Sequence, residues 1–171
     1  GFFESNGDET FSDSGNYGFS SNTFNSYSSV IGDYDNNGTI EILVNNDSSQ
    51  LPSFWENTEV TSRNYLLVSS EGPISNKDGI GSMIEISVSG NKQYRYVMSG
   101  EGYLSQNMLT EHFGIGNANM IDYVKITWLS GIEDIIYNVS PNQTLTIIEG
   151  SVLSTHDIID NSQLRFFPNP V

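Results

Sequence analysis

Apolar residues alternate with polar residues in short segments, and this alternation restricts the fold more strongly than any other feature of the chain. It is clearest in residues 83–89 and 121–128. The apolar positions are Ile84, Ile86 and Val88 in the first segment and Val124, Ile126 and Trp128 in the second. A period of two places these side chains on one face of a β-strand. No stretch shows the period of a helix, so the sequence predicts an all-β protein.

Residues 63–150 contain several such segments, separated by turns. The predicted strands span residues 64–68, 83–89, 93–98, 121–128, 132–137 and 144–148. A turn at Ser89-Gly90-Asn91 joins two of them, and the returning strand places Tyr94, Tyr96 and Met98 on one face. About seven short strands at this spacing predict an antiparallel β-sandwich.

Residues 1–62 form a smaller predicted unit. Aromatic residues flank the turn Asn6-Gly7-Asp8, which is typical of a β-hairpin. Residues 12–26 are rich in Ser, Asn and Gly and are predicted to be a loop. Further strands are predicted at residues 27–31, 40–45 and 54–57. An acidic loop therefore lies between two strands of this unit.

That loop, residues 32–41, has the residue types and spacing of a calcium site. Oxygen-bearing side chains occupy loop positions 1, 3, 5 and 9, namely Asp33, Asp35, Asn37 and Glu41. Gly38 stands where the backbone must turn sharply, and the carbonyl of Thr39 adds another oxygen. Ca²⁺ takes roughly six to eight oxygen ligands. These four side chains and the Thr39 carbonyl are therefore the predicted metal ligands, and Ca²⁺ is the predicted cofactor.

Other interpretations of the loop differ in how well they fit. In an EF-hand the loop lies between helices and position 12 is Glu, whereas strands flank this loop and position 12 is Val44. Zinc is disfavoured because no Cys or His lies nearby. A plain turn stays open, since Asp, Asn and Gly favour tight turns for backbone reasons. A turn, however, needs no carboxylate at position 9.

The charge of the chain restricts its partners. Asp and Glu number 21 against 6 Lys and Arg, which gives a formal net charge of −15. Nucleic acid is excluded as a partner because its phosphates would be repelled, and cations are favoured. No apolar run reaches the about 18 residues of a membrane span, so no membrane insertion is expected. Cysteine is absent, so an extracellular fold would depend on packing or metal rather than disulfides.

The first unit resembles an FG-GAP (VCBS) repeat. The similarity lies in residues 3–11 (FESNGDETF), 32–38 (GDYDNNG) and 42–45 (ILVN). Asn37 and Glu41 replace the Asp that the family usually has at these positions. The resemblance implies one calcium-decorated β-propeller blade. A closed propeller needs about four to eight blades, so we expect a partial propeller within a longer protein.

The second unit is similar to the ASPIC/UnbV domain, which follows FG-GAP propellers in cartilage acidic protein and in many secreted bacterial proteins. The similar segments are residues 75–81 (SNKDGIG), 100–106 (GEGYLSQ), 112–116 (HFGIG), 124–131 (VKITWLSG) and 138–143 (NVSPNQ). Leu129 stands where the family commonly has proline. The resemblance implies a domain that accompanies propellers and has no catalytic residues of its own.

Few other residues are candidates for chemistry. Asn76 and Asp78 lie beside glycines and form either a second cation loop or a turn. His112 is expected to be a hydrogen-bonded histidine near the core, and His156 lies in a linker, so neither a His-metal cluster nor a catalytic triad is predicted. Tyr103 either stacks on a sugar or packs half-buried with its hydroxyl bonded. No catalytic residue is predicted.

The end of the chain indicates export. Residues 151–163 are expected to be a linker, and residues 164–171 (LRFFPNPV) resemble the start of the C-terminal sorting domain of type IX secretion substrates. That resemblance implies the type IX secretion machinery as a partner. It also implies a Bacteroidota-type bacterium that secretes the protein or holds it at the outer-membrane cell surface.

Together these features predict a non-catalytic, calcium-stabilised module of a secreted or surface protein. Its expected role is adhesion or the binding of an extracellular protein or carbohydrate. The alternative is an accessory region of a secreted hydrolase or polysaccharide-processing enzyme, with the catalytic part elsewhere in the parent protein.

Overall fold

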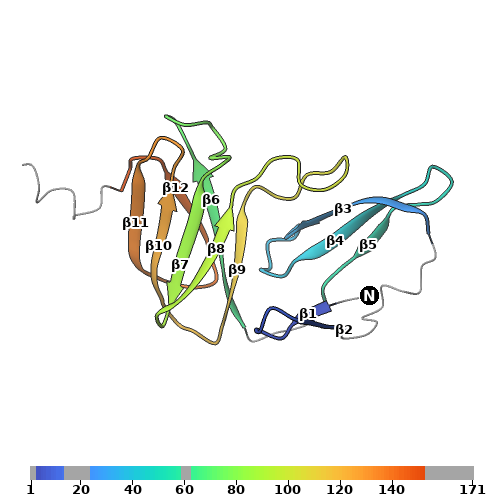
Figure 1. The fold of residues 1–171 in the computed structure, drawn as a ribbon, viewed down its shortest axis with the longest axis horizontal. Coiled ribbons are helices and arrows are strands. Elements are labelled where there is room, and N and C mark those ends of the chain that lie inside the picture. The colour runs from blue at the N-terminus through green and yellow to red at the C-terminus, as the bar shows by residue number, and fades with distance from the viewer. Residues whose placement is uncertain (1–2, 14–23, 59–62, 153–171) are drawn as a thin grey trace, which may run out of the picture.

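The computed structural model describes residues 3–13, 24–58 and 63–152, and these residues contain strands and no helix. Four sheets are formed (Figure 1). The all-β prediction is therefore confirmed. Residues 164–171 and all but the first two residues of the predicted linker lie outside the described residues.

The second unit consists of two sheets. Its strands are β6 (Asn64–Glu71), β7 (Met83–Val88), β8 (Asn91–Tyr96), β9 (Glu111–Gly116), β10 (Ile121–Thr127), β11 (Glu133–Val139) and β12 (Thr144–Ile148). One sheet has the order β11-β10-β7-β8 and the other the order β12-β6-β9. These seven strands agree with the expected total of about seven, but only six of them were located in the sequence. β9 has no counterpart among the predicted strands, because the glycines of its HFGIG sequence weaken the strand pattern.

Apolar side chains from both sheets share one core. Leu66, Val68 and Phe113 come from the three-stranded sheet, and Ile84, Ile86, Val124 and Ile126 come from the four-stranded sheet. All seven are 0% exposed, and Trp128 joins them at 2%. Removal of this apolar surface from water is the main stabilising contribution. The alternation in residues 83–89 and 121–128 thus identified the core face correctly, although Val88 is only partly buried.

The returning strand β8 presents its aromatic residues to solvent. Tyr94, Tyr96 and Met98 are all exposed, while the neighbouring Val97 is fully buried. β8 ends at Tyr96, two residues before the predicted end. The face on which the sequence placed these three side chains is therefore exposed to solvent.

One strand pairing departs from the antiparallel prediction. β12 runs parallel to β6, with Thr144 opposite Leu67, whereas β9 pairs with β6 in the antiparallel sense. β12 follows β11, which belongs to the other sheet. The chain therefore crosses between sheets at this point, and a crossover permits a parallel pair that a hairpin does not.

The first unit contains a hairpin and a separate three-stranded sheet. Its strands are β1 (Phe3–Ser5), β2 (Phe11–Asp13), β3 (Ser26–Gly32), β4 (Glu41–Asn46) and β5 (Ser53–Trp55). β1 and β2 pair antiparallel, which confirms the predicted hairpin. β3, β4 and β5 form an antiparallel sheet in chain order. β5 is shorter than the predicted strand at residues 54–57.

The two units contact each other through the connection between β8 and β9. This segment extends toward β3 (Figure 1). The Met108 amide donates to the Ile31 carbonyl at 3.3 Å, and the Ile31 amide donates to Asn107 Oδ1 at 3.0 Å. The outer edge of β3 is thus hydrogen-bonded to the second unit at Ile31.

Candidate cation site

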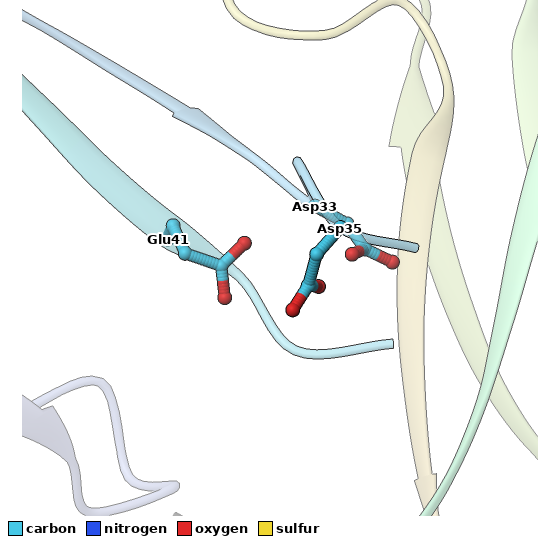
Figure 2. A group of neighbouring side chains, drawn as sticks. All are labelled: Asp33, Asp35 and Glu41. Atoms are coloured by element: carbon cyan, nitrogen blue, oxygen red, sulfur yellow. The ribbon is translucent and has the colours of Figure 1, made fainter. Parts of the chain in front are cut away.

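Three carboxylates converge in the loop between β3 and β4. Asp33 and Asp35 follow β3, and Glu41 begins β4. Each offers an oxygen, and these oxygens lie within 4.8 Å of one another. Figure 2 shows Glu41 reaching from its strand toward the two aspartates of the loop. Among the described residues, this is the one group of three or more acidic or His side chains with metal-binding geometry.

Backbone amides of the loop hold Asp33 in place. Its Oδ1 accepts a hydrogen bond from the Asn37 amide at 3.0 Å, and its Oδ2 accepts one from the Gly38 amide at 2.9 Å. Positive φ angles at Asn36 (59°) and Gly38 (88°) curl the chain around these carboxylate oxygens. Asn and Gly are the residues that adopt such angles most readily. The local sequence therefore folds the loop around Asp33.

Glu41 is the buried member of the group. It is 2% exposed, and its carboxylate accepts hydrogen bonds from the Tyr34 amide at 3.1 Å and the Thr39 hydroxyl at 2.9 Å. The described residues give it no cationic partner. These two neutral hydrogen bonds offset part of the cost of burying a carboxylate beside two others, and a bound cation would offset more of it. The geometry therefore fits a bound metal as well as a plain turn.

The other two predicted ligands, Asn37 and Thr39, are hydrogen-bonded within the loop. Asn37 Oδ1 accepts from the Thr39 amide at 2.7 Å and lies 2.6 Å from the Thr39 hydroxyl, whose single hydrogen it shares with Glu41. Asn37 Nδ2 donates to Asp35 Oδ2 at 2.8 Å. The described contacts of Thr39 involve its amide and hydroxyl. The structure therefore brings the three predicted carboxylates together, with Asn37 hydrogen-bonded to one of them, and Asn37 would have to exchange a hydrogen bond for a metal contact.

The loop also packs against the second unit. Gly38 lies against the Tyr65 ring so closely that an added Cβ would be 2.0 Å from Cε1 of Tyr65. Its carbonyl lies 2.9 Å from Nε2 of His112, and the His112 ring stacks on Tyr65 with centroids 6.0 Å apart and an interplanar angle of 9°. His112 is partly buried and hydrogen-bonded, as expected, but sequence gave no signal for its partner 74 residues away.

The second unit contains the segments that resemble the ASPIC/UnbV domain. Its similar segments lie on β9 and β10 and in the turns between strands. Residues 72–154 match the model of the ASPIC and UnbV family. The match covers β7 to β12, so the predicted resemblance is confirmed for this part of the chain. No curated protein matches the chain.

The other candidate cation loop contains Asn76 and Asp78 and lies in the region that matches ASPIC and UnbV. Asn76 Oδ1 accepts from the Ile80 amide and Asn76 Nδ2 donates to the Ile80 carbonyl, both at 2.8 Å. Both the oxygen and the nitrogen of the Asn76 side-chain amide are thus already hydrogen-bonded. Of the two interpretations, the hydrogen bonds favour the turn.

Tyr103 of the ASPIC/UnbV region differs from the favoured expectation. It is 67% exposed rather than half-buried. It lies between Gly102 and Leu104, which both have positive φ angles, 82° and 50°. The loop therefore holds the ring out into solvent, where it is available to a ligand.

Sequence reasoning missed one perturbed carboxylate of the ASPIC/UnbV region. Glu111 lines a cavity of ≈ 340 Å³ together with Ile31 and Ile40 of the first unit. Burial raises the pKa of its carboxyl to about 7, and Glu101 adds to the increase while Arg95 opposes it. Such a shift depends on which segments pack together, so no local sequence pattern predicts it.

Proposed function

We propose that the chain is a non-catalytic, calcium-stabilised module of a secreted or cell-surface protein that serves adhesion or ligand binding. The observation that supports this most directly is the convergence of Asp33, Asp35 and Glu41 in a loop that packs on the second unit. A cation there would neutralise a buried carboxylate and fix the contact between the units. The part of the chain that matches ASPIC and UnbV is consistent with an accessory module.

Calcium is the ion that the ligand set favours. Every candidate ligand is an oxygen, from Asp33, Asp35, Asn37, Glu41 or the Thr39 carbonyl. Hard oxygen donors with mixed carboxylate, amide and carbonyl character suit Ca²⁺, and water would complete its shell. Bound calcium would act as a structural ion, because the carboxylates come from both strand ends that the loop joins.

A structural role also fits the environment of the single nearby histidine. Nε2 of His112 is engaged by the Gly38 carbonyl, and its ring is stacked on Tyr65. The histidine thus supports the loop instead of facing a reactive group. The FG-GAP and type IX export parts of the proposal rest on the sequence resemblances in residues 3–45 and 164–171.

The proposal is tested by melting the full chain with calcium and with EGTA. An ion that binds only the folded state stabilises it by about 2.7 kcal/mol at roughly a hundred times its Kd. We expect calcium to raise the melting temperature of the wild-type chain and Asp35→Asn to lose most of that increase. Asp47→Asn is the matched control, because Asp47 lies at the other end of β4 and bonds Ser48.

Two results would count against a calcium module. The first is a wild-type melting temperature that is the same with calcium and with EGTA. The second is a calcium response that Asp35→Asn and Asp47→Asn reduce equally, since that would indicate a general charge effect and no specific site.

A further inference from the structure

A groove of ≈ 450 Å³ lies where the β3-β4-β5 sheet meets the connection between β8 and β9. It is lined by the aromatic residues Phe24, Tyr27, Trp55 and Tyr103, and between them by serines and Asn46. None of the described lining residues is charged. In a chain with 21 acidic residues, an uncharged groove of this size is a distinct local environment.

The aromatic rings come from both units and stand in solvent. Tyr27 on β3 is 56% exposed, Tyr103 is 67% exposed and Phe24 is 42% exposed. Exposed tyrosine rings offer a flat apolar face with a polar edge. The C–H face of a sugar ring packs on such a surface, while its hydroxyls remain free to hydrogen-bond elsewhere.

Hydrogen bonds hold the Tyr103 loop in position. The Ser105 hydroxyl donates to the Glu101 carbonyl at 2.9 Å, and Asn107 Nδ2 donates to Glu101 Oε2 at 2.9 Å. Asn107 in turn accepts from the Ile31 amide of β3. These hydrogen bonds hold the Tyr103 loop in one conformation before a ligand binds. Less conformational entropy of the loop is therefore lost on binding.

The polar groups of the groove are oriented by a buried amide. Asn46 is 5% exposed, accepts from the Ser26 hydroxyl at 2.9 Å and donates to Ser53 Oγ at 3.0 Å. Ser26 has thus used its hydrogen and offers an acceptor. Ser53 is 8% exposed, and its own hydrogen has no acceptor among the described residues. Ser26 therefore offers an acceptor and the Ser53 hydroxyl can donate, which together complement sugar hydroxyls, since these do both.

Charge and edge geometry disfavour other ligands. The net charge of −15 repels polyanions, and an uncharged groove offers no partner for a charged group. An extended peptide would add to a free strand edge. The β3 edge is hydrogen-bonded to Asn107 and Met108 at Ile31, which blocks a peptide from pairing at that end of the strand.

We propose that this groove binds a neutral oligosaccharide, stacked on Tyr27 and Tyr103 and hydrogen-bonded to Ser26 and Ser53, which Asn46 positions. The inference rests on the proposed function as a binding module and specifies its ligand class. It does not require the calcium site, because none of the predicted metal ligands lines the groove.

The test is calorimetric titration of the full chain with neutral gluco-, xylo- and manno-oligosaccharides, and with oligogalacturonate as the acidic counterpart. We expect at least one neutral series to bind and oligogalacturonate not to bind. Tyr27→Ala and Tyr103→Ala should each weaken binding by roughly three- to tenfold, the range expected for loss of an aromatic contact. Tyr94→Ala, on the exposed face of β8, should leave the affinity unchanged.

Several outcomes would overturn the inference. They are the absence of binding by every neutral series at millimolar concentration, equal binding of oligogalacturonate, and an affinity that neither groove variant reduces. Sedimentation that shows a dimer dissociated by Tyr103→Ala would assign the groove to a second copy of the chain instead. Titration and melting are separate measurements, so a chain that responds to calcium but binds no sugar would refute this inference alone.

Discussion

At the scale of single residues, buried carboxylates stabilise the ASPIC/UnbV region without a cationic partner among the described residues. Asp134 is 0% exposed and accepts from Trp128 Nε1 at 2.7 Å and from the Gly150 and Val152 amides at 2.8 and 2.9 Å. Glu149 is 4% exposed. Burial acts to raise its pKa, but hydrogen bonds from Ser130 and Ser75 and from the Ile74 amide outweigh this effect and lower it to about 2.

Asp134→Asn should destabilise the protein by about 1.5–3 kcal/mol, because it weakens charge-assisted hydrogen bonds. It also places the NH₂ group of the new amide against N–H donors, with which it cannot hydrogen-bond. Urea denaturation would measure the loss. Asp78→Asn is the matched control, since Asp78 is exposed and its carboxylate makes no hydrogen bond to the described residues. We expect a change within about 0.5 kcal/mol. Equal stability of the two variants would refute the structural role of Asp134.

At the scale of elements, period-two alternation predicted the core strands well. β7 and β10 begin where predicted and bury the predicted side chains apart from Val88, which is partly buried. The convergence of Asp33, Asp35 and Glu41 was also predictable, because they lie within nine consecutive positions of one loop. Two features of the fold could not be predicted from any short stretch of the sequence. The parallel pairing of β12 depends on a crossover between sheets, and the contact of Gly38 with Tyr65 and His112 joins distant segments.

Gly38→Ala tests the contact between β6 and the loop that joins β3 to β4. An added Cβ would both strain a φ of 88° and meet the Tyr65 ring at 2.0 Å. We expect a loss of about 1–3 kcal/mol in the free energy of unfolding, measured with urea. Gly90→Ala is the control, because φ is 79° but no atom lies within 4 Å of the added carbon.

A second comparison separates backbone strain from steric clash at this contact. In a Tyr65→Ala background, Gly38→Ala should cost less than in the wild-type chain, because the clashing ring is gone. Additive effects of the two substitutions would show that Gly38 and Tyr65 do not interact.

At the scale of the whole molecule, the cavity around Glu111 joins the two units and depends on pH. The pKa of Glu111 rises from its ordinary value of 4.5 to about 7 in the folded chain, chiefly through burial. Its protonated form is therefore favoured by folding. The associated stability is fully present below about pH 4.5 and is lost as the pH rises toward about 7.

Glu111→Gln removes this titration. The wild-type chain should lose stability relative to the variant between about pH 4.5 and about pH 7, and the difference should then stay constant at higher pH. Urea denaturation at a series of pH values would measure it. Glu133→Gln, at an exposed glutamate of β11, is the control. A wild-type-to-variant difference that does not vary with pH would show that Glu111 titrates normally.

The bonds that Asn107 and Met108 make to β3 have a consequence for behaviour at high protein concentration. An unpaired sheet edge is a template on which another chain can add, and such edges promote aggregation. β3 is the longest strand of its sheet and is closed along Ile31, whereas β5 at the opposite edge is only three residues long. The same contact that joins the two units therefore protects the longer edge strand from intermolecular pairing.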